Sequence, residues 1–364
     1  MQKEKLFERH EAFWRRELSQ AIVNTDCSSW RRVPSIPALP DIWMDREPFI
    51  IDPATLEPRE LQPPPLDLGT PDNSTGETAF NVLLPYWRIP WVAGIVGCDL
   101  KVTASSGGVW PESTLDDDWY RKPDQGFSPN LEWLDKLLEF IRYAARLYHL
   151  GEAVVTADNI ARGPGDLMLH LLSPDRLYAG FYDHPDEIKS LLERITDYYI
   201  RWASEQLKAI PRLNGGYCNQ YGIWSPGTFI RTQEDYAMTL SRDTFREFIL
   251  PAARRVADSF EYQVFHTHSG FPPLADWMME VENLKCIEVA IDPHGPTYEE
   301  LIPQWNRILE EKCLLIMGAT TQKQLDYLLS NLTPNGLWLD TELFTEEELA
   351  DAWSFDKSEK YTKR

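Results

Sequence analysis

From residue 131 onward, two hydrophobic patterns alternate along the chain. Short apolar runs of strand length are separated by longer segments in which apolar residues recur at helical spacing. The apolar runs are Ala153–Asp158, Gly216–Trp224, Gln263–His268, Cys286–Ile291, Cys313–Gly318 and Leu337–Asp340. The segments with helical spacing cover residues 131–150, 186–208, 243–260, 274–281, 298–310 and 322–331. This alternation predicts parallel strands joined by right-handed helical crossovers.

The fold that this pattern favours is a single (β/α)8 TIM barrel of the α/β class. Six strand–helix units are visible, and the longer N-terminal part could supply two more strands. An open doubly wound sheet is the competing interpretation. No G-x-G-x-x-G follows a strand and no phosphate-binding loop is present, so nothing in the sequence indicates a nucleotide site.

The N-terminal part has a different character. Residues 3–23 predict an amphipathic helix, and residues 33–90 hold 12 of the 27 prolines, a density that prevents long regular elements. We therefore expect a helix and an irregular proline-rich wrapping segment over residues 1–80, the barrel over 81–353 and a polar tail over 354–364.

Composition restricts the class of partner and the compartment. The formal net charge is −21, from 57 acidic and 36 basic residues, which argues against nucleic acid and anionic membranes as partners. No stretch reaches the ~18 consecutive apolar residues of a membrane span. The first residues contain no apolar signal-peptide core. The five scattered cysteines form no C-x-x-C pair, so we expect a cytoplasmic protein with reduced thiols.

The strongest chemical signal is the end of the run Gln263–His268. His266 and His268 are two residues apart, so on a strand both imidazoles project from the same face. A glycine turn follows at Gly270, which places both rings where a barrel enzyme has its active site. We predict that these histidines are catalytic.

Three roles for the histidine pair remain open at this stage. A catalytic zinc site has three protein ligands and one open position, and Glu288, Asp292 or His294 could supply the third ligand. Without a metal, imidazoles of ordinary pKa could bind or protonate a substrate directly. The pair could also be structural, each ring bonded to a neighbouring carboxylate.

Three further residues are predicted to lie at the barrel mouth. Asp158 ends an apolar run and is a candidate base or cation partner, or else a helix cap. Trp110 follows a glycine-rich stretch and could cover the mouth, or lie in an ordinary surface loop. Asp340 ends the last strand and could contact substrate, or cap the helix beginning near Thr345.

An aromatic cluster could form the wall of a substrate site. Tyr217 and Tyr221 are four apart on what reads as one strand, and Trp224 follows. Inward-facing rings would suit a flat apolar ligand. The alternative is that all three belong to the core.

Several segments, taken in order, resemble the uroporphyrinogen decarboxylase superfamily, which includes tetrapyrrole decarboxylases and methyltransferases that act with corrinoids. The segments are Pro85–Trp91 with Gly97-Cys98, Gly163–Leu167, Tyr182–Ile188, Ser241–Pro251 and the His266-x-His268-Ser-Gly strand end. They span roughly residues 80–340 of this chain. The resemblance implies a (β/α)8 barrel with its site at the carboxyl ends of the strands.

The chain also departs from this family in two motifs. The decarboxylase's arginine-rich N-terminal motif is not found, and the methyltransferases' His-x-Cys zinc pattern has His268 in place of the cysteine. The resemblance implies methyl transfer with a corrinoid protein or a methylated small molecule. Because the cysteine is missing, a His-His-carboxylate zinc site is the form of metal site that stays open. Decarboxylation of a tetrapyrrole or other carboxylated ring is the alternative, and a non-catalytic small-molecule-binding barrel is the second alternative. A homodimer is a further expectation.

Overall fold

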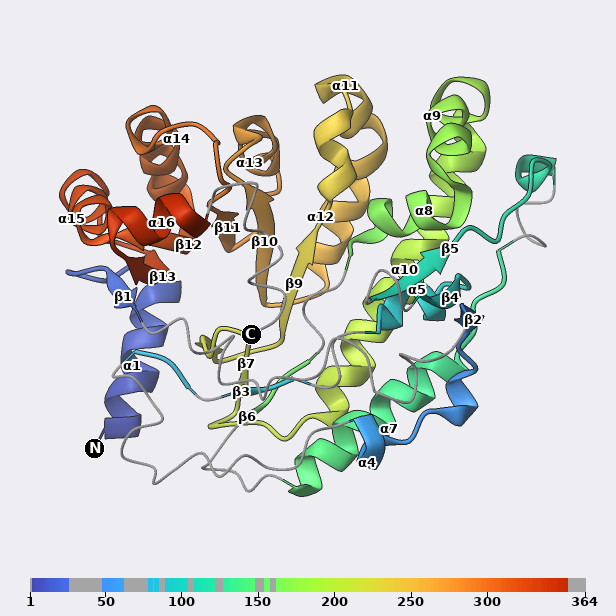
Figure 1. Ribbon diagram of the computed structural model, residues 1–364, viewed down its shortest axis with the longest axis horizontal. Coiled ribbons are helices and arrows are strands. Elements are labelled where there is room, and N and C mark those ends of the chain that lie inside the picture. The colour runs from blue at the N-terminus through green and yellow to red at the C-terminus, as the bar shows by residue number, and fades with distance from the viewer. Residues whose placement is uncertain are drawn as a thin grey trace. The chain divides into compact units, whose positions relative to one another are not determined.

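The computed structural model describes residues 2–25, 48–61, 78–80, 82–84, 89–103, 108–121, 127–147, 154–157 and 162–352. The chain divides into two compact units. Unit 1 comprises Met1–Ser28, Thr75–Ala79 and Val264–Arg364, and unit 2 comprises Ser29–Ser74 and Phe80–Gln263. Figure 1 traces both units along the chain.

Unit 1 is built on parallel strands in the order β1, β13, β12, β11, β10. The strands are β1 (Ile22–Asn24), β10 (Tyr262–His268), β11 (Cys286–Ala290), β12 (Cys313–Thr321) and β13 (Leu337–Phe344). The helices are α1 (Gln2–Trp14), α13 (Pro272–Met278), α14 (Tyr298–Glu311), α15 (Gln322–Asn331) and α16 (Glu346–Ala352). Helices α14, α15 and α16 pack on β12 (Figure 1). The predicted mixed α/β class with a parallel sheet is confirmed.

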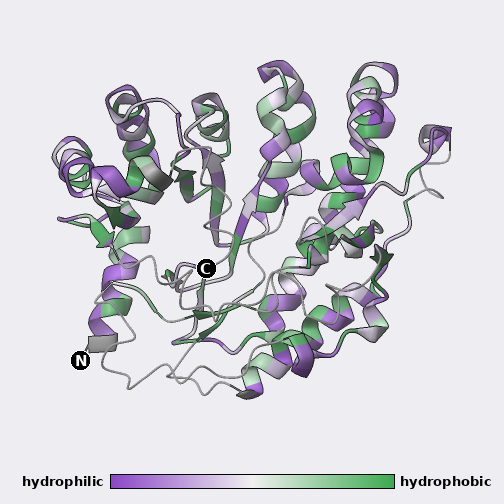
Figure 2. Cartoon of the chain, in the orientation of Figure 1, coloured by the Kyte–Doolittle hydropathy of each residue, from purple (hydrophilic) through white to green (hydrophobic). Residues whose placement is uncertain are grey.

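The strands of unit 1 are apolar because both faces of their sheet are covered. Leu314 and Leu315 are adjacent on β12 and so point to opposite faces of the sheet, and both are fully buried. Figure 2 shows apolar residues along β11–β13, whereas α14 and α15 carry both apolar and strongly polar residues. This distribution is typical of a parallel sheet beneath amphipathic helices.

Helices α14 and α15 of unit 1 begin at side-chain caps. The Thr321 hydroxyl accepts from the Gln324 backbone N–H, and the Gln324 side chain accepts from the Thr321 N–H, which forms a capping box for α15. Thr297 and Glu300 do the same for α14. The helices predicted over 298–310 and 322–331 are therefore confirmed.

The helix predicted over residues 3–23 is wrong in its second half. Helix α1 ends at Trp14, and Arg16 has a positive φ of 57° that ends the helical path. Residues Ile22–Asn24 instead form strand β1, whose Ile22 pairs with Trp338 and whose Asn24 pairs with Asp340. The pairing joins residues more than 300 positions apart, so local periodicity could not indicate it.

Unit 2 consists mainly of helices around the long helix α10 (Pro185–Ala209), which packs on α7, α8, α9 and α12. The other helices are α4 (Pro58–Leu61), α5 (Trp91–Ile95), α7 (Glu132–Leu147), α8 (Pro164–Leu172), α9 (Pro174–Asp183), α11 (Arg242–Thr244) and α12 (Leu250–Asp258). A π-helical turn, Phe245–Ile249, joins α11 to α12, and short 3-10 turns cover Pro53–Thr55, Trp119–Arg121 and Asp235–Thr239. The strands are β2 (Phe49–Ile50), β3 (Val82–Leu83), β4 (Asp99–Thr103), β5 (Gly108–Glu112), β6 (Val154–Val155), β7 (Tyr217–Cys218), β8 (Trp224–Ser225) and β9 (Phe229–Gln233).

The run Gly216–Trp224, predicted as one strand, is a hairpin. Strand β7 pairs antiparallel with β8, with Cys218 opposite Trp224. The chain reverses through Gly222, whose φ of +73° and whose closeness to the Phe80 backbone leave no room for a side chain. Among the described residues, each helix is either too short or too polar to span a bilayer.

Candidate functional site

The histidine pair lies at the carboxyl end of β10, as predicted. Strand β10 pairs in parallel with β11, and this register sets His266 beside Glu288 and His268 beside Ala290. Asp292 follows two residues after Ala290, where the Asp292 backbone N–H donates to Ser269 Oγ. The sheet register thus brings two carboxylates to the two imidazoles.

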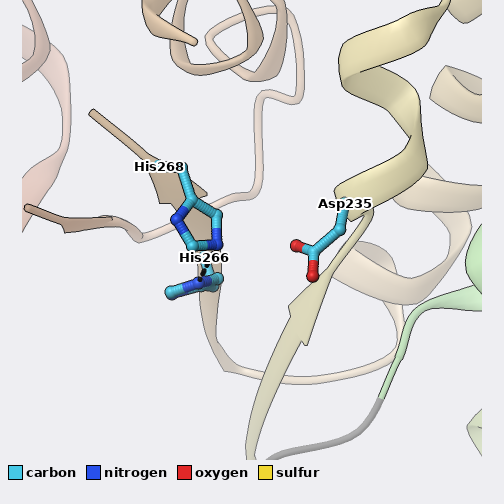
Figure 3. Close-up of side chains that lie close together, drawn as sticks. All are labelled: Asp235, His266 and His268. Atoms are coloured by element: carbon cyan, nitrogen blue, oxygen red, sulfur yellow. Dashed lines mark hydrogen bonds between the residues drawn. The ribbon is translucent and has the colours of Figure 1, made fainter. Parts of the chain in front are cut away.

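The four side chains form one continuous chain of contacts. His266 Nδ1 lies 2.6 Å from Glu288 Oε1, and His268 Nδ1 lies 2.7 Å from Asp292 Oδ1. The two Nε2 atoms face each other at 3.2 Å, as Figure 3 shows. The imidazole planes are nearly perpendicular, at 84°. Each ring is therefore held by a carboxylate on one side and meets the other ring on its opposite side.

Burial decreases along this chain of contacts. The Glu288 side chain is fully buried and that of His266 is 9% exposed, whereas His268 and Asp292 are 31% and 29% exposed. Asp292 is also fixed by its surroundings, because the Gly270 backbone N–H donates to its second carboxylate oxygen at 2.8 Å. His268 and Asp292 are thus accessible to solvent, whereas His266 and Glu288 are anchored in the core.

The protonation of the four ring nitrogens determines what can lie at the centre of this arrangement. A carboxylate is an acceptor, so each Nδ1 that faces one carries the proton. In the neutral tautomers both Nε2 atoms are then acceptors, and two acceptors at 3.2 Å repel each other. Either one ring is an imidazolium that donates to the other, or a cation lies between the two nitrogens. An imidazolium can give a proton to a substrate, and a bound cation can act as a Lewis acid.

The residues predicted as a third metal ligand have other contacts in unit 1. Glu288 and Asp292 accept from the Nδ1 atoms, on the side of each ring away from the facing Nε2 atoms. His294 is exposed, has a positive φ of 61° and lines a separate pocket together with Asp292. The carboxylates therefore orient the rings.

The predicted aromatic wall is buried in the core of unit 2. The Tyr217 hydroxyl donates to the Leu207 carbonyl and the Trp224 indole N–H donates to the Leu213 carbonyl. Tyr221 is fully buried. The contacts with Leu207 and Leu213 are structural ones within this unit.

The other predicted site residues are spread over the chain. Trp110 lies on β5 and is 56% exposed. Asp340 lies within β13, which continues past it to Phe344, and its carboxylate accepts from the Asn24 side chain at 2.7 Å. Asp158 lies outside the described residues.

A second polar cluster, in unit 2, was not predicted. Glu234 accepts from the backbone N–H groups of Gly165 and Asp166 at the start of α8, at 3.1 and 2.9 Å. Asp166 in turn accepts from the backbone N–H groups of Asp235 and Tyr236, both at 3.0 Å. We call Asp166 and Glu234 the reciprocal acid pair. The sequence does contain a local signal of an acid at a helix start, because Asp166 follows Gly163-Pro164-Gly165 and lies in the first turn of α8.

The reciprocal acid pair has unusual protonation. Burial, followed by the neighbouring charge of Asp235, raises the pKa of Asp166 to about 6. Burial, followed by the charge of Asp166, raises the pKa of Glu234 well above its ordinary value. Arg162 pairs with both Asp166 and Asp235 and offsets part of this effect. Asp235, also drawn in Figure 3, belongs to this unit.

The comparisons with known proteins concern the fold. No family model matches the chain, and no curated protein matches it by sequence. Among solved structures, a methyltransferase from Methanosarcina mazei is similar to this chain with a TM-score of 0.55 and 12% sequence identity. The similarity covers 98% of both chains. The chain therefore has a fold of the type seen in that methyltransferase.

Proposed function

We propose that this chain is a zinc-dependent methyltransferase of the uroporphyrinogen decarboxylase superfamily, built on a (β/α)8 barrel. His266 and His268 hold the metal through their Nε2 atoms. The observation that carries the proposal is the pair of Nε2 atoms facing each other at 3.2 Å, each ring having its Nδ1 on a carboxylate. The fold shared with a methyltransferase supports the reaction class.

The residues present fit a zinc ion. Around a tetrahedral ion with zinc–nitrogen bonds of about 2.0–2.1 Å, neighbouring ligand atoms lie roughly 3.3 Å apart. The observed separation of 3.2 Å between the two Nε2 atoms is close to this spacing. Histidine ligands of metals commonly donate their other N–H to a carboxylate, as both histidines do here.

The four residues have distinct roles in this proposal. Glu288 and Asp292 are positioning residues that keep the proton on each Nδ1 and so leave each Nε2 lone pair for the metal. A bound zinc ion supplies positive charge that lowers the pKa of a thiol or hydroxyl and so favours the nucleophilic form. The partial exposure of His268 leaves a route for an acceptor to reach this position.

The proposal also names the partners. The methyl donor is a corrinoid protein or a methylated small molecule, and the acceptor is a thiol or hydroxyl compound. We place the protein in the cytoplasm, since Cys98, Cys218, Cys286 and Cys313 are free and buried, as thiols are in a reducing compartment.

The test combines metal content with turnover. Purified protein is reloaded with zinc and mixed with methylcobalamin and 2-mercaptoethanol, and loss of the methyl group is followed by absorbance. We expect about one zinc per chain and measurable transfer. H266A and H268A should lose the zinc and lower the rate more than about 100-fold, since outer-shell changes alone cost about 10–100-fold.

A matched control is H184A, because His184 stacks on Tyr120 in unit 2 and has no part in the histidine pair. H184A should keep its zinc and its rate. Wild-type protein that retains no zinc under replete conditions, or transfer that is unchanged in H266A, would contradict the proposal.

A further inference from the structure

A pocket of about 800 Å³ lies in unit 1 beside the ends of β11 and β12. Its lining includes Ile291 and Asp292, which follow β11, and Thr321, which ends β12. The Asp292 carboxylate is the one that accepts from His268 Nδ1 at 2.7 Å. The pocket wall therefore includes Asp292, the more exposed of the two carboxylates that contact the histidine pair. An 800 Å³ space suits a small molecule.

The charge that lines this pocket is mostly negative. Four carboxylates line it, against one lysine, Lys323. The carboxylates are those of Asp292, Glu299, Asp326 and Glu346. Among the described residues, Glu299 and Glu346 have no ion-pair partner, and Asp326 accepts only from the neutral Gln322 amide at 2.8 Å. Their charge is thus available to a ligand.

The rest of the lining is aromatic and apolar. Tyr298 and Tyr327 are half-buried and line the pocket together with Leu349. Burial raises the pKa of Tyr298, so its phenol stays neutral at physiological pH. Neutral tyrosine rings attract cations through their negative faces, and the attraction increases where water is excluded. Acids combined with tyrosine faces favour an organic cation over a hydrated inorganic one.

We infer that this pocket binds a small organic cation with an apolar portion, of the N-alkylated ammonium class. The inference rests on the proposed function in one respect: the cation is the methyl donor, whose N-methyl group passes to the thiol or hydroxyl acceptor while the dealkylated amine leaves and the acceptor's proton is released. Asp292 connects the two features, because it lines the pocket and bonds to His268.

The test uses choline as the cation and 3,3-dimethyl-1-butanol, its neutral carbon isostere, as the matched probe. Binding to the full-length protein is followed by tyrosine-selective NMR and by calorimetry. Choline should bind and should shift the resonances of Tyr298 and Tyr327, and the isostere should bind at least about tenfold more weakly, given the strength of cation–aromatic and ionic contacts.

Neighbouring glutamates provide a matched pair of variants. E346Q removes a lining carboxylate, whereas E347Q removes the next residue of α16, which does not line the pocket. We expect E346Q to weaken choline binding about two- to fivefold, the range for a partly exposed charge pair, and E347Q to leave it unchanged. Equal binding of choline and its isostere, absence of choline binding, or equal effects of E346Q and E347Q would overturn the inference.

Zinc content is measured on the same samples, so that the two proposals fail separately. Zinc retained by His266 and His268 without choline binding overturns the inference and leaves the metal site standing. Choline binding in protein that retains no zinc does the reverse: it supports the pocket as a cation site and contradicts the proposed function.

Discussion

Two polar clusters of this chain use carboxylates in opposite ways. In the reciprocal acid pair of unit 2, Asp166 and Glu234 each accept from two backbone N–H groups, and those groups belong to the segment of the other acid. In unit 1, Glu288 and Asp292 accept from imidazole side chains, and the opposite nitrogens of those rings face each other.

The difference separates a structural cluster from one built for a ligand. Each acid of the reciprocal pair is used to hold backbone, so the cluster fixes the start of α8 to the segment that begins at Asp235. The acids of the histidine cluster orient the two imidazole rings, and the two Nε2 atoms lie 3.2 Å apart. In the histidine cluster, a proton or cation between the two facing nitrogens relieves the repulsion of their lone pairs.

The largest expected effect concerns stability. D166A leaves the buried backbone N–H groups of Asp235 and Tyr236 without their acceptor. Each unsatisfied buried donor costs about 1–3 kcal/mol, so for two donors we expect the free energy of unfolding to fall by about 2–6 kcal/mol in urea denaturation. D175A, a first-turn acid of the neighbouring helix α9, is the control and should change it by less than about 0.5 kcal/mol. A near-neutral D166A would remove the structural role of the pair.

The next effect concerns metal affinity. E288Q replaces the carboxylate on His266 Nδ1 with an amide and should weaken zinc binding about 10–100-fold, measured by competition with a chelator. D292N makes the same change at His268, where the site is about 30% exposed and water can substitute, so the loss should be smaller. The expected order is wild type, D292N, E288Q. Unchanged affinity in E288Q would show that the carboxylates do not support a metal.

A smaller effect concerns the pH dependence of stability. The pKa of Asp166 is about 6 in the folded protein and 3.8 ordinarily, so the folded state binds more protons than the unfolded state between these values. Stability contributed by this group is therefore present below about pH 4 and is lost as the pH rises through about 6. Glu234, whose pKa is also raised, acts in the same direction.

D166N removes the Asp166 part of this slope. The denaturation midpoint of D166N, recorded from pH 4 to pH 7, should fall less steeply than that of the wild type. Arg162 and Asp235 are the other charged groups that act on Asp166. A wild-type midpoint that rises through this pH range would contradict the assignment of a protonated, buried acid.

Local signals predicted the helices and the central strands but not their long-range partners. Helix α15 was predicted at its observed bounds because apolar spacing acts over a few residues, and the Thr321/Gln324 capping box that the structure shows is equally local. Strand β1 was missed, since only its pairing with β13 makes it a strand. The hairpin at Gly222 was missed because an apolar aromatic run resembles one strand.

The candidate site shows the same division. His266 and His268 were predicted from their spacing, which any strand converts into a shared face. Glu288 and Asp292 were named as candidate third metal ligands. Their bonds to the two Nδ1 atoms depend on the β10–β11 register, which joins residues 22 and 24 positions apart and has no local signature. The reciprocal acid pair spans 68 to 70 residues and was missed for the same reason.

The most direct test of the central claim is the X-ray absorption spectrum of the zinc-loaded protein. The account predicts a first shell that contains two imidazole nitrogens at about 2.0–2.1 Å in the wild type, and no bound-zinc signal from H266A or H268A reconstituted in the same way. A first shell without imidazole, or one that is the same in wild type and H266A, would contradict the claim that these two histidines bind the metal.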